Sequence, residues 1–355
     1  MTDDIFSHYP SVRGNSRAMA MLSAVLHEKG LVDDAVAMAT AAIEAAPESM
    51  AVRDMIGHAL SNGVQSFHVP MLLDHARNAA YARAIRRMVH PGMRVLEIGT
   101  GGGLLAMLCA EAGAIVTTCE AQPTIAATAR AIVDRNGFSD RVRVISKRSD
   151  LLSIPEDMDA PAELVVHEIF GRRLFDEGVT AALRDARERL LIAGAPALPA
   201  QAEIRCALAR SVDVRRRVGT IEGFDMSLFN LLTVPGRQLR LKKREHVDYC
   251  SETASVLRMD YDAPAPFGPQ SESVSLVSTG GRVDGVMQWI RLDFGAGETL
   301  ESDPFSKDGA TSWGATLFDF AAPLETAPGD IVEVTISHKD LRLLIDAVVR
   351  PRSSM

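Results

Sequence analysis

Two glutamates, nine positions apart in the chain, could do chemistry together. Residues 165–178 read VVHEIFGRRLFDEG, and Glu168 and Glu177 stand beyond the end of the apolar run. Two carboxylates in one cleft repel each other unless a cation lies between them. A guanidinium is planar and always charged, and its N–H donors match two carboxylates. Acids that hold its charge on one side leave the opposite nitrogen more electron-rich and fix its line of attack. The pair therefore indicates a guanidinium site.

A glycine-rich loop, EIGTGGG at residues 97–103, follows the first of two strands that apolar runs predict. Glycine at the carboxyl end of a strand lets a ligand approach the backbone. Glu120 ends the second predicted strand, where a carboxylate can accept hydrogen bonds from both hydroxyls of a ribose. The spacing differs from GxGxxG and is typical of the first motif of S-adenosylmethionine-dependent methyltransferases. The alternative is a tight structural turn followed by a surface acid.

Just upstream, the segment MLLDHARNAAY at residues 71–81 places apolar and charged residues three and four positions apart. This spacing predicts part of one helix over residues 71–89. Arg77 on that helix could pair its guanidinium with the carboxylate of the cofactor, in a bidentate geometry that lysine cannot reproduce. The alternative is an ordinary amphipathic helix with solvated charges.

The elements that must position these residues are predicted from a change of periodicity along the chain. Strands at residues 94–98 and 115–119 alternate with helices at 104–112 and 124–136, RVRVIS and AELVVHE supply two further strands, and a helix follows at 179–191. This order predicts an α/β fold with a parallel, doubly wound, Rossmann-like sheet over residues 66–197. Short alternating runs over residues 198–355 predict an antiparallel barrel or sandwich, with a projecting arm at about 212–247.

Residues 1–65 are expected to form a separate helical region. The stretch 16–62 is rich in alanine, and a self-comparison at a shift of 34 pairs Leu22 with Ile56 and Leu26 with Leu60. This pattern resembles one tetratricopeptide repeat and the first helix of a second. Since about three repeats are needed for a stable solenoid, we expect these helices to pack on the next domain or on a second subunit. The alternative is an alanine-rich hairpin of no repeat family.

The composition bounds the class of protein. The chain has 355 residues, 47% of them hydrophobic, and a net charge of -8, which argues against nucleic acid as the main partner and suits a cationic substrate. Its four cysteines have no CxxC spacing, so we expect neither a metal site nor disulfides. The N-terminus lacks an apolar signal region, and no apolar run is long enough to span a membrane. These features favour a cytoplasmic protein without a membrane partner.

The motifs in combination resemble the protein arginine methyltransferase family. Residues 165–178 look like its double-E loop, MLLDHARNAAY resembles its pre-strand helix, and VLEIGTGGG its first cofactor motif. The segments EGFDMSLFN and GVMQWIRLDF are similar to the branch that contains the type III, monomethylating enzyme. TSWGATLFDF stands where the family has its Thr-His-Trp loop, with Ser312 in place of the histidine. A Tyr-Phe-x-x-Tyr element before Phe67 is not recognisable.

The resemblance implies S-adenosyl-L-methionine as the cofactor, a β-barrel after the nucleotide-binding domain, an arm inserted in the barrel and a homodimer. It implies that Glu168 and Glu177 bind the guanidinium and that Trp313 walls the pocket. Ser312 and Arg172 would complete the substrate site. The implied cofactor-binding residues are Met71, Arg77, Glu97, Gly99, Gly101 and Glu120.

Free L-arginine is the substrate that the sequence favours. Arg172 and Arg173 should repel an arginine-rich peptide but could pair with the α-carboxylate of the free amino acid. Such an enzyme would belong to a biosynthetic pathway, by analogy with arginine methyltransferases of natural-product clusters. Peptidyl arginine is the close alternative as substrate. The alternative for Arg172 and Arg173 is that both side chains face solvent. An inactive scaffold, or an O-methyltransferase with His167 as general base, are hypotheses from other classes.

Overall fold

The computed structural model describes residues 2–212, 217–233, 236–239, 247–306, 312–339 and 341–350. The chain forms two compact units. The first comprises Met1–Leu73, Tyr81–Glu168 and Asp185–Ala195. The second comprises Asp74–Ala80, Ile169–Arg184 and Pro196–Met355.

The first unit begins with helices. Their bounds are α1 (Thr2–His8), the 3-10 turn η1 (Pro10–Val12), α2 (Ser16–Glu28), α3 (Val32–Ala45) and α4 (Met50–Leu60). Asn15 caps α2 by accepting from the Ala18 N–H, and Ser49 caps α4 by accepting from the Val52 N–H. The starts of α2 and α4 are 34 positions apart, and both α3 and α4 pack on α2. Alanines let the helices approach closely, and the buried core includes Met19, Leu26, Ala35, Met38, Ala39, Ala42, Val52 and Ile56.

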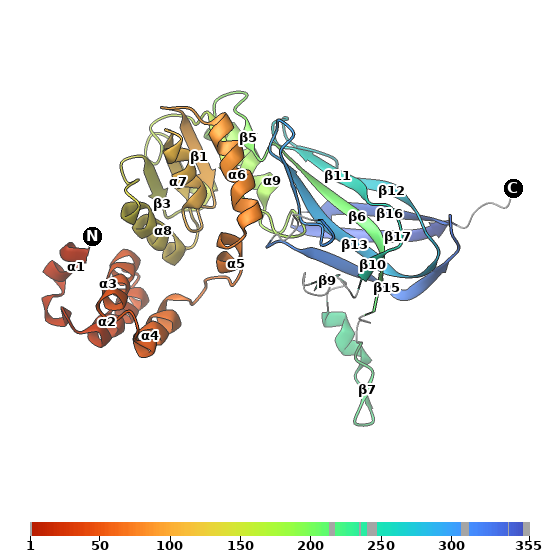
Figure 1. Ribbon diagram of the computed structural model, residues 1–355, viewed down its shortest axis with the longest axis horizontal. Helices are drawn as coiled ribbons and strands as arrows, with labels where there is room; N and C mark the ends of the chain where they lie inside the picture. Colours follow the sequence, from red (N-terminus) through yellow and green to blue (C-terminus); the bar gives the residue numbers. More distant parts are fainter. Residues whose placement is uncertain are drawn as a thin grey trace. The chain divides into compact units, whose positions relative to one another are not determined.

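Four parallel strands follow in the first unit, in the order β3-β2-β1-β4, and belong to a five-stranded sheet. Its strands are β1 (Arg94–Ile98), β2 (Ile115–Cys119), β3 (Val142–Ile145) and β4 (Leu164–His167), and the register pairs Ile98 with Cys119 on one side and with His167 on the other. The helices between them are α7 (Leu104–Glu111) and α8 (Pro123–Arg135), with η2 (Ser149–Leu151) after β3 (Figure 1). The predicted Rossmann-like parallel sheet is confirmed, and the carboxyl ends of β1, β2 and β4 meet at one edge.

The single helix predicted over residues 71–89 is wrong, because the segment forms two helices. They are α5 (His68–Leu72) and α6 (His75–Met88). The break falls at Asp74, whose Oδ1 accepts a hydrogen bond of 3.0 Å from the Arg77 backbone N–H. A side chain that caps the start of α6 ends the preceding helix, since the residue at a cap leaves the helical conformation. The helix after β4 is α9 (Val179–Arg189), close to its predicted range.

The second unit is built mainly from antiparallel strands. A seven-stranded sheet contains the path β10-β6-β13-β15-β9, and a second sheet has the order β12-β16-β17. The C-terminal antiparallel region predicted from alternating runs is therefore confirmed. The bounds are β5 (Ala197–Leu198), β6 (Gln201–Ser211), β10 (Val247–Tyr249), β11 (Ala254–Asp260), β12 (Ser271–Val277), β13 (Gly281–Asp293), β14 (Thr299–Glu301), β15 (Ala315–Thr326), β16 (Ile331–Lys339) and β17 (Arg342–Arg350).

The segment predicted as an arm forms small elements of its own. They are β7 (Thr220–Ile221) and β8 (Phe224–Asp225), which pair with each other, then η3 (Ser227–Leu232) and β9 (Gly236–Leu239). Residues 213–216, 234–235 and 240–246 of the predicted arm lie outside the described residues. Across β7, β8 and η3 the large apolar side chains are exposed.

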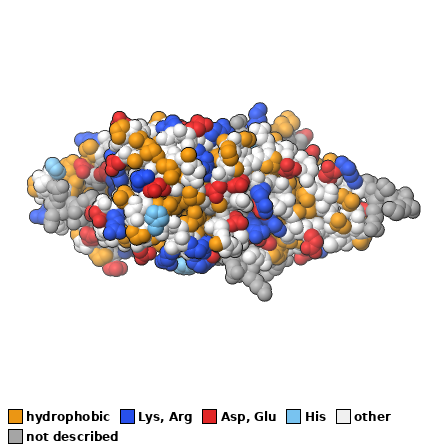
Figure 2. All heavy atoms as spheres, turned by 90° about the horizontal axis from the view of Figure 1, so that it is seen from above, with side chains coloured by type: hydrophobic (Ala, Val, Ile, Leu, Met, Phe, Trp, Pro, Cys, Tyr) orange, Lys and Arg blue, Asp and Glu red, His pale blue; other side chains and the backbone are white. Residues whose placement is uncertain are grey.

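Four further findings concern the surface and the composition of the described residues. On the face drawn in Figure 2, acidic and basic side chains are interspersed rather than gathered by sign. Among the described helices, none combines the length and apolarity needed to cross a bilayer. In the same residues, no cluster of three or more His, Cys, Asp or Glu side chains could hold a metal ion. All four cysteines are buried and free.

Candidate active site

The glycine loop after β1 leaves space in front of its backbone. Gly101 has a φ of +49°, and a Cβ added there would lie 3.7 Å from Met71 Cε and 3.9 Å from His68 Nδ1. The side chains of α5 therefore form one wall of this space, and the Gly101 backbone forms the other. An L side chain at Gly101 would be strained and would partly fill the cradle. Glycine at this position lets a ligand come close to the backbone at the edge of the sheet.

Glu120, directly after β2, lies against this loop. Its Oε2 accepts a hydrogen bond of 3.2 Å from the Gly101 N–H, and its Oε1 accepts one of 2.9 Å from the Gln122 N–H. A carboxylate has about four acceptor positions. Each oxygen therefore keeps a lone pair for a further donor, as two ribose hydroxyls require.

Glu97 braces the loop from inside the sheet. It is buried, and its Oε2 accepts hydrogen bonds from the Thr100 hydroxyl at 3.0 Å and from the Thr118 hydroxyl at 2.5 Å. These contacts tie the loop after β1 to β2. Both of these hydroxyls belong to the loop or the sheet, and Gly99, in the same loop, donates its N–H to the Cys119 carbonyl.

His68 belongs to the same cradle, although it is not among the residues predicted from the sequence. Burial lowers the pKa of His68, and the nearby Glu120 carboxylate acts in the opposite direction. A neutral imidazole beside a ligand site can donate or accept a hydrogen bond without a charge. Its position three residues before Met71, on the same side of a helix, is the signal that could have found it.

A tight loop separates Glu168 from Glu177. Glu168 comes directly after β4 and is half-buried, while Glu177 is exposed on the segment before α9. The chain turns sharply at Gly171, where an added Cβ would lie 3.0 Å from Asp176 Oδ2. A side chain at this point would require the exposed Asp176 carboxylate to shift by a few tenths of an ångström.

Buried rings anchor this loop in the second unit. Phe170 packs against Trp313 with ring centroids 5.6 Å apart, and Phe175 stacks on His338 at 4.0 Å and 11°. Between them, Leu174 is buried and has a φ of +67°, an uncommon backbone conformation for a leucine. Such conformations persist where the surrounding packing fixes them, and they gather at functional sites. Trp313 and the predicted double-E loop are thus brought together.

Asp74 links Arg77 and Ser312, two of the predicted site residues. It is buried, and besides accepting from the Arg77 N–H, it accepts a short hydrogen bond from the Ser312 N–H. The Arg77 side chain is also buried, and its Nη1 donates to Asn78 Oδ1 at 2.7 Å. Within the described chain, the buried Ser312 hydroxyl has no hydrogen-bond partner, so it offers a polar group where the sequence places the substrate.

The two arginines of the loop are both half-buried. Arg173 lies over the Phe318 ring, 5.3 Å from its centroid, and is held by a cation–π contact. The Arg172 side chain donates no hydrogen bond to another described residue, but its carbonyl accepts one of 2.9 Å from Gln288 Nε2. Burial lowers the Arg172 pKa, Asp176 raises it and Arg173 lowers it, yet a guanidinium stays charged at physiological pH. Arg172 is therefore the better placed of the two to meet an anion.

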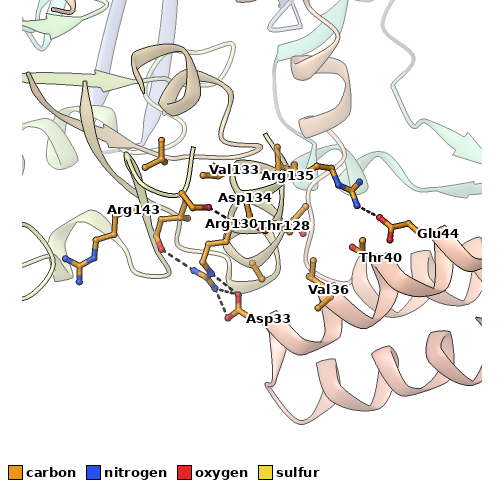
Figure 3. A pocket seen from close by; sticks show the side chains of 17 residues that line it. Asp33, Val36, Thr40, Glu44, Thr128, Arg130, Val133, Asp134, Arg135 and Arg143 are labelled. Atoms are coloured by element: carbon orange, nitrogen blue, oxygen red, sulfur yellow. Dashed lines mark hydrogen bonds and ion pairs between the residues drawn. The ribbon is translucent and has the colours of Figure 1, made fainter. Parts of the chain in front are cut away.

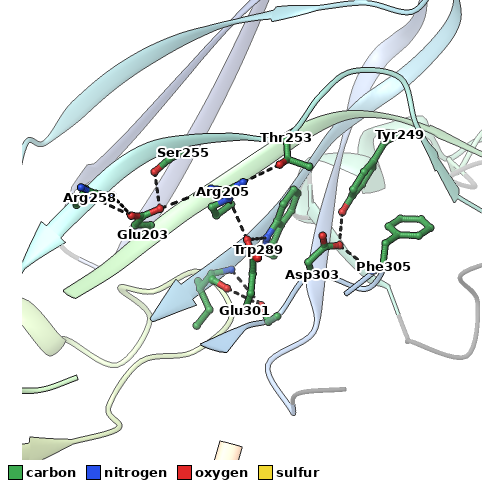
Figure 4. A network of polar contacts seen from close by, with 12 residues as sticks. Glu203, Arg205, Tyr249, Thr253, Ser255, Arg258, Trp289, Glu301, Asp303 and Phe305 are labelled. Carbon is green, nitrogen blue, oxygen red and sulfur yellow. Dashed lines mark hydrogen bonds and ion pairs between the residues drawn. The ribbon is translucent and has the colours of Figure 1, made fainter. Parts of the chain in front are cut away.

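A polar network in the seven-stranded sheet holds residues 301–305 in place (Figure 4). Glu301 accepts from Trp289 Nε1 at 3.0 Å and pairs with Arg205, 3.1 Å away. Asp303 accepts from the Tyr249 hydroxyl at 2.8 Å. Burial, with Asp303 next to it, raises the Tyr249 pKa, so the phenol stays protonated and donates.

Comparison with known proteins assigns the chain to a family. No protein-family model matches the sequence. An arginine N(omega)-methyltransferase of Streptomyces achromogenes subsp. streptozoticus is 33% identical over 313 residues, which cover 86% of each chain. The chain belongs to the arginine N-methyltransferases. Protein arginine N-methyltransferase 7 of Danio rerio is 29% identical over 79% of this chain and 45% of that protein.

Solved structures share the fold of this arginine N-methyltransferase. The Trypanosoma brucei PRMT1 enzyme-prozyme complex matches with a TM-score of 0.71 and 22% identity, over 83% of this chain and 96% of that one. Arabidopsis thaliana protein arginine methyltransferase 10 matches with a TM-score of 0.67 and 21% identity, over 83% and 96% of the two chains. Identities this low support the fold alone, and the family assignment comes from the bacterial relative.

The loop anchor of this arginine N-methyltransferase is expected to be sensitive to acid. Burial lowers the His338 pKa below 6.5, against a hydrogen bond with the Pro269 backbone that raises it. Between the folded-state pKa and 6.5 the unfolded chain binds more protons, so stability falls as pH is lowered through this window and is fully present above it. We expect the urea midpoint to fall more steeply below pH 6.5 in the native protein than in His338→Phe. Equal pH dependence in both would contradict this account.

Proposed function

We propose that this chain transfers a methyl group from S-adenosyl-L-methionine to a terminal guanidino nitrogen of free L-arginine, and that it adds one methyl. The observation that carries the proposal is the loop from Phe170 to Gly178, which packs on Trp313 and carries Glu177 a few residues after Glu168. Family membership supports arginine as the methyl acceptor. Peptidyl arginine remains the competing substrate.

The cofactor half of the site would use the cradle after β1. Glu120 would accept the ribose hydroxyls, Gly99 and Gly101 would let the ligand approach the backbone, and Met71 would cover it. Glu97 would hold the glycine loop in the conformation that binds the ligand. Arg77 would pair with the carboxylate. When bound, S-adenosyl-L-methionine supplies an electrophilic methyl group on a sulfonium.

The protein's part in the reaction would be to bind and orient the guanidinium. Glu168 and Glu177 would each accept hydrogen bonds from it, which keeps the positive charge near the carboxylates and leaves the remaining nitrogen with more lone-pair density. Orientation of the attacking nitrogen removes several kcal/mol from such a barrier, on the order of 7 in well-aligned intramolecular models. Trp313 would exclude water from one side of the substrate.

The choice of free arginine rests on Arg172. Its half-buried guanidinium could form a charge-assisted hydrogen bond with the α-carboxylate, which a peptide lacks. The test is a steady-state comparison of kcat/KM for L-arginine and for an arginine-glycine-rich peptide. A higher value for L-arginine supports the proposal, and a higher value for the peptide assigns the protein to protein modification.

Arg172→Gln is expected to raise the KM for free L-arginine by about 10-fold to 100-fold, the range for losing a hydrogen bond to a charged group. The same change should alter kcat/KM for the peptide by less than about threefold, because no α-carboxylate is lost there. Arg184→Gln, at an exposed position on α9, is the matched control. Equal losses for both substrates would show that Arg172 does not read the carboxylate.

We also propose that the protein is a cytoplasmic homodimer with three segments, namely a tetratricopeptide-like region at 1–65, a cofactor domain at 66–197 and a β-barrel at 198–355. The arm within the barrel would bind a second copy. Exposed apolar side chains support this role, because a protein surface seldom leaves so many large ones together without a partner. They are Ile221, Phe224, Met226, Leu228, Phe229, Leu231 and Leu232.

Leu231→Asp is expected to weaken the dimer by about 30-fold or more, since a central apolar anchor often contributes 2 kcal/mol. Leu231 is 81% exposed in the single chain. Sedimentation equilibrium over a range of concentrations measures the effect. Met50→Asp, at an apolar residue of α4 that is 85% exposed, is the control and should leave the association unchanged. If both variants associate like the native protein, the arm is not the dimer contact.

A further inference from the structure

The N-terminal helices touch the first turn of α8, which follows Glu120. At the end of α2, His27 Nε2 lies 2.8 Å from the hydroxyl of the buried Thr124. In the loop after α4, Gly63 has a φ of +79°, and a Cβ added there would lie 2.8 Å from Gln122 Nε2. Two separate points of the helical region therefore meet the same three residues of the chain, 122–124.

Further along α8, ion pairs fix α3 to the same helix (Figure 3). Asp33 accepts two hydrogen bonds of 2.8 Å from Arg130, and Glu44 pairs with Arg135 at 2.5 Å. A pocket of about 880 Å³ lies between α3, α8 and β3. These pairs are largely exposed, and such pairs contribute about 0 to 1 kcal/mol each. They hold α3 in place along α8, whereas the contacts with 122–124 lie next to the cofactor cradle.

The residues at this turn are linked to the carboxylate by consecutive hydrogen bonds. Gln122 Oε1 accepts from the Thr124 N–H at 3.1 Å and so caps α8. The Gln122 N–H donates to Glu120 Oε1 at 2.9 Å, and Glu120 Oε2 accepts from the Gly101 N–H at 3.2 Å. Gln122 thus meets the helical region through its side-chain amide and Glu120 through its backbone N–H. Displacing the amide would remove the cap from the Thr124 N–H, and the resulting shift of the Gln122 backbone would move the Glu120 carboxylate relative to the glycine loop.

We infer that the N-terminal helical region positions Glu120, through the contacts of His27 and Gly63 with residues 122–124, and thereby sets the affinity for the adenosyl group. His27 and Gly63 are positioning residues and touch no ligand. The inference rests on the proposed role of Glu120 in binding the ribose. It gives the helical region a function at the cofactor site of its own chain, independent of any docked protein.

The contact at Gly63 can be tested with a matched pair of glycines. Gly63→Ala and Gly30→Ala both place a side chain at a positive φ, +79° and +76°, and so carry a similar backbone strain. Only the Cβ added at Gly63 would meet a neighbour, since a Cβ on Gly30 meets nothing within 4 Å. Any difference in ligand affinity between the two variants therefore reports the displacement of Gln122.

Titration calorimetry of the full-length protein with S-adenosylhomocysteine is the experiment. We expect His27→Ala and Gly63→Ala to weaken binding by about threefold to tenfold, the range for losing one hydrogen bond. The KM for S-adenosyl-L-methionine should rise by the same factor, with kcat and the KM for L-arginine within about twofold, because the substrate half is untouched. His27→Gln, which keeps a hydrogen-bonding group, should recover most of the affinity.

Three results would overturn the inference, and a fourth would overturn its premise. Native-like affinity in His27→Ala and Gly63→Ala would overturn the inference, as would a loss in Gly30→Ala equal to that in Gly63→Ala. A fall in kcat as large as the rise in KM would point to a general structural defect and would also contradict it. Glu120→Gln tests the premise separately, because an unchanged affinity in that variant means that Glu120 does not bind the ribose.

Discussion

Glu168→Gln is expected to lower kcat by about 100-fold to 10,000-fold, the range for removing a group that stabilises charge or moves a proton in the transition state. Glutamine keeps the size of the side chain but removes the negative charge that would hold the guanidinium. It also replaces one acceptor with an N–H₂ donor, which opposes the N–H donors of arginine. Glu177→Gln should have an effect of the same kind.

The carboxylate pair should behave as one unit. The double variant is expected to lose about as much activity as the more impaired single variant, because the remaining acid cannot hold the guanidinium alone. Affinity for S-adenosylhomocysteine should stay within about threefold of the native value in all three, since neither residue is among those proposed to contact the cofactor. Glu188→Gln, at an exposed position of α9, is the control. Near-native kcat in Glu168→Gln would remove the chemical basis of the proposal.

The second large effect is expected at the cofactor. Glu120→Gln should weaken S-adenosylhomocysteine binding by about 10-fold to 100-fold, from hydrogen bonds to a charged group worth about 1.5–3 kcal/mol. The carboxylate already accepts from Gly101 and Gln122. An amide cannot accept at both ends, so one of these backbone donors would lose its partner and the loop would shift.

Glu111→Gln is the matched control for the cofactor prediction. Glu111 is exposed at the end of α7 and pairs only at 3.4 Å with Arg86, a surface contact with little effect on stability. Its replacement should leave the dissociation constant for S-adenosylhomocysteine within about twofold. Equal affinities for the native protein and Glu120→Gln would mean that the ribose lies elsewhere.

Much of the cofactor half could be predicted because its signals are local. The strands β1 and β2 are apolar runs of five residues that end at the glycine loop and before Glu120. In a parallel sheet the carboxyl ends of neighbouring strands share an edge, so a spacing in sequence becomes a place in space. The position of Glu120 next to Gly101 follows from this rule and from no remote contact.

The remainder depended on contacts between residues distant in the chain. Asp74 interrupts the predicted helix because it caps α6, and its hydrogen bond with the Ser312 N–H joins positions 238 residues apart. The packing of Phe170 on Trp313 has the same character. Helical periodicity predicts which face of a helix is buried but not what it packs on, so the contact of His27 with Thr124 could not be predicted either.

Glu168 and Glu177 are proposed to bind one guanidinium together, so that it is methylated. The most direct measurement is tandem mass spectrometry of L-arginine after incubation with the purified protein and S-adenosyl-L-methionine labelled in its methyl group. We expect a single labelled methyl on a terminal guanidino nitrogen, absent with Glu168→Gln. A protein that binds S-adenosylhomocysteine yet labels neither L-arginine nor an arginine-glycine-rich peptide would contradict it and support the inactive scaffold.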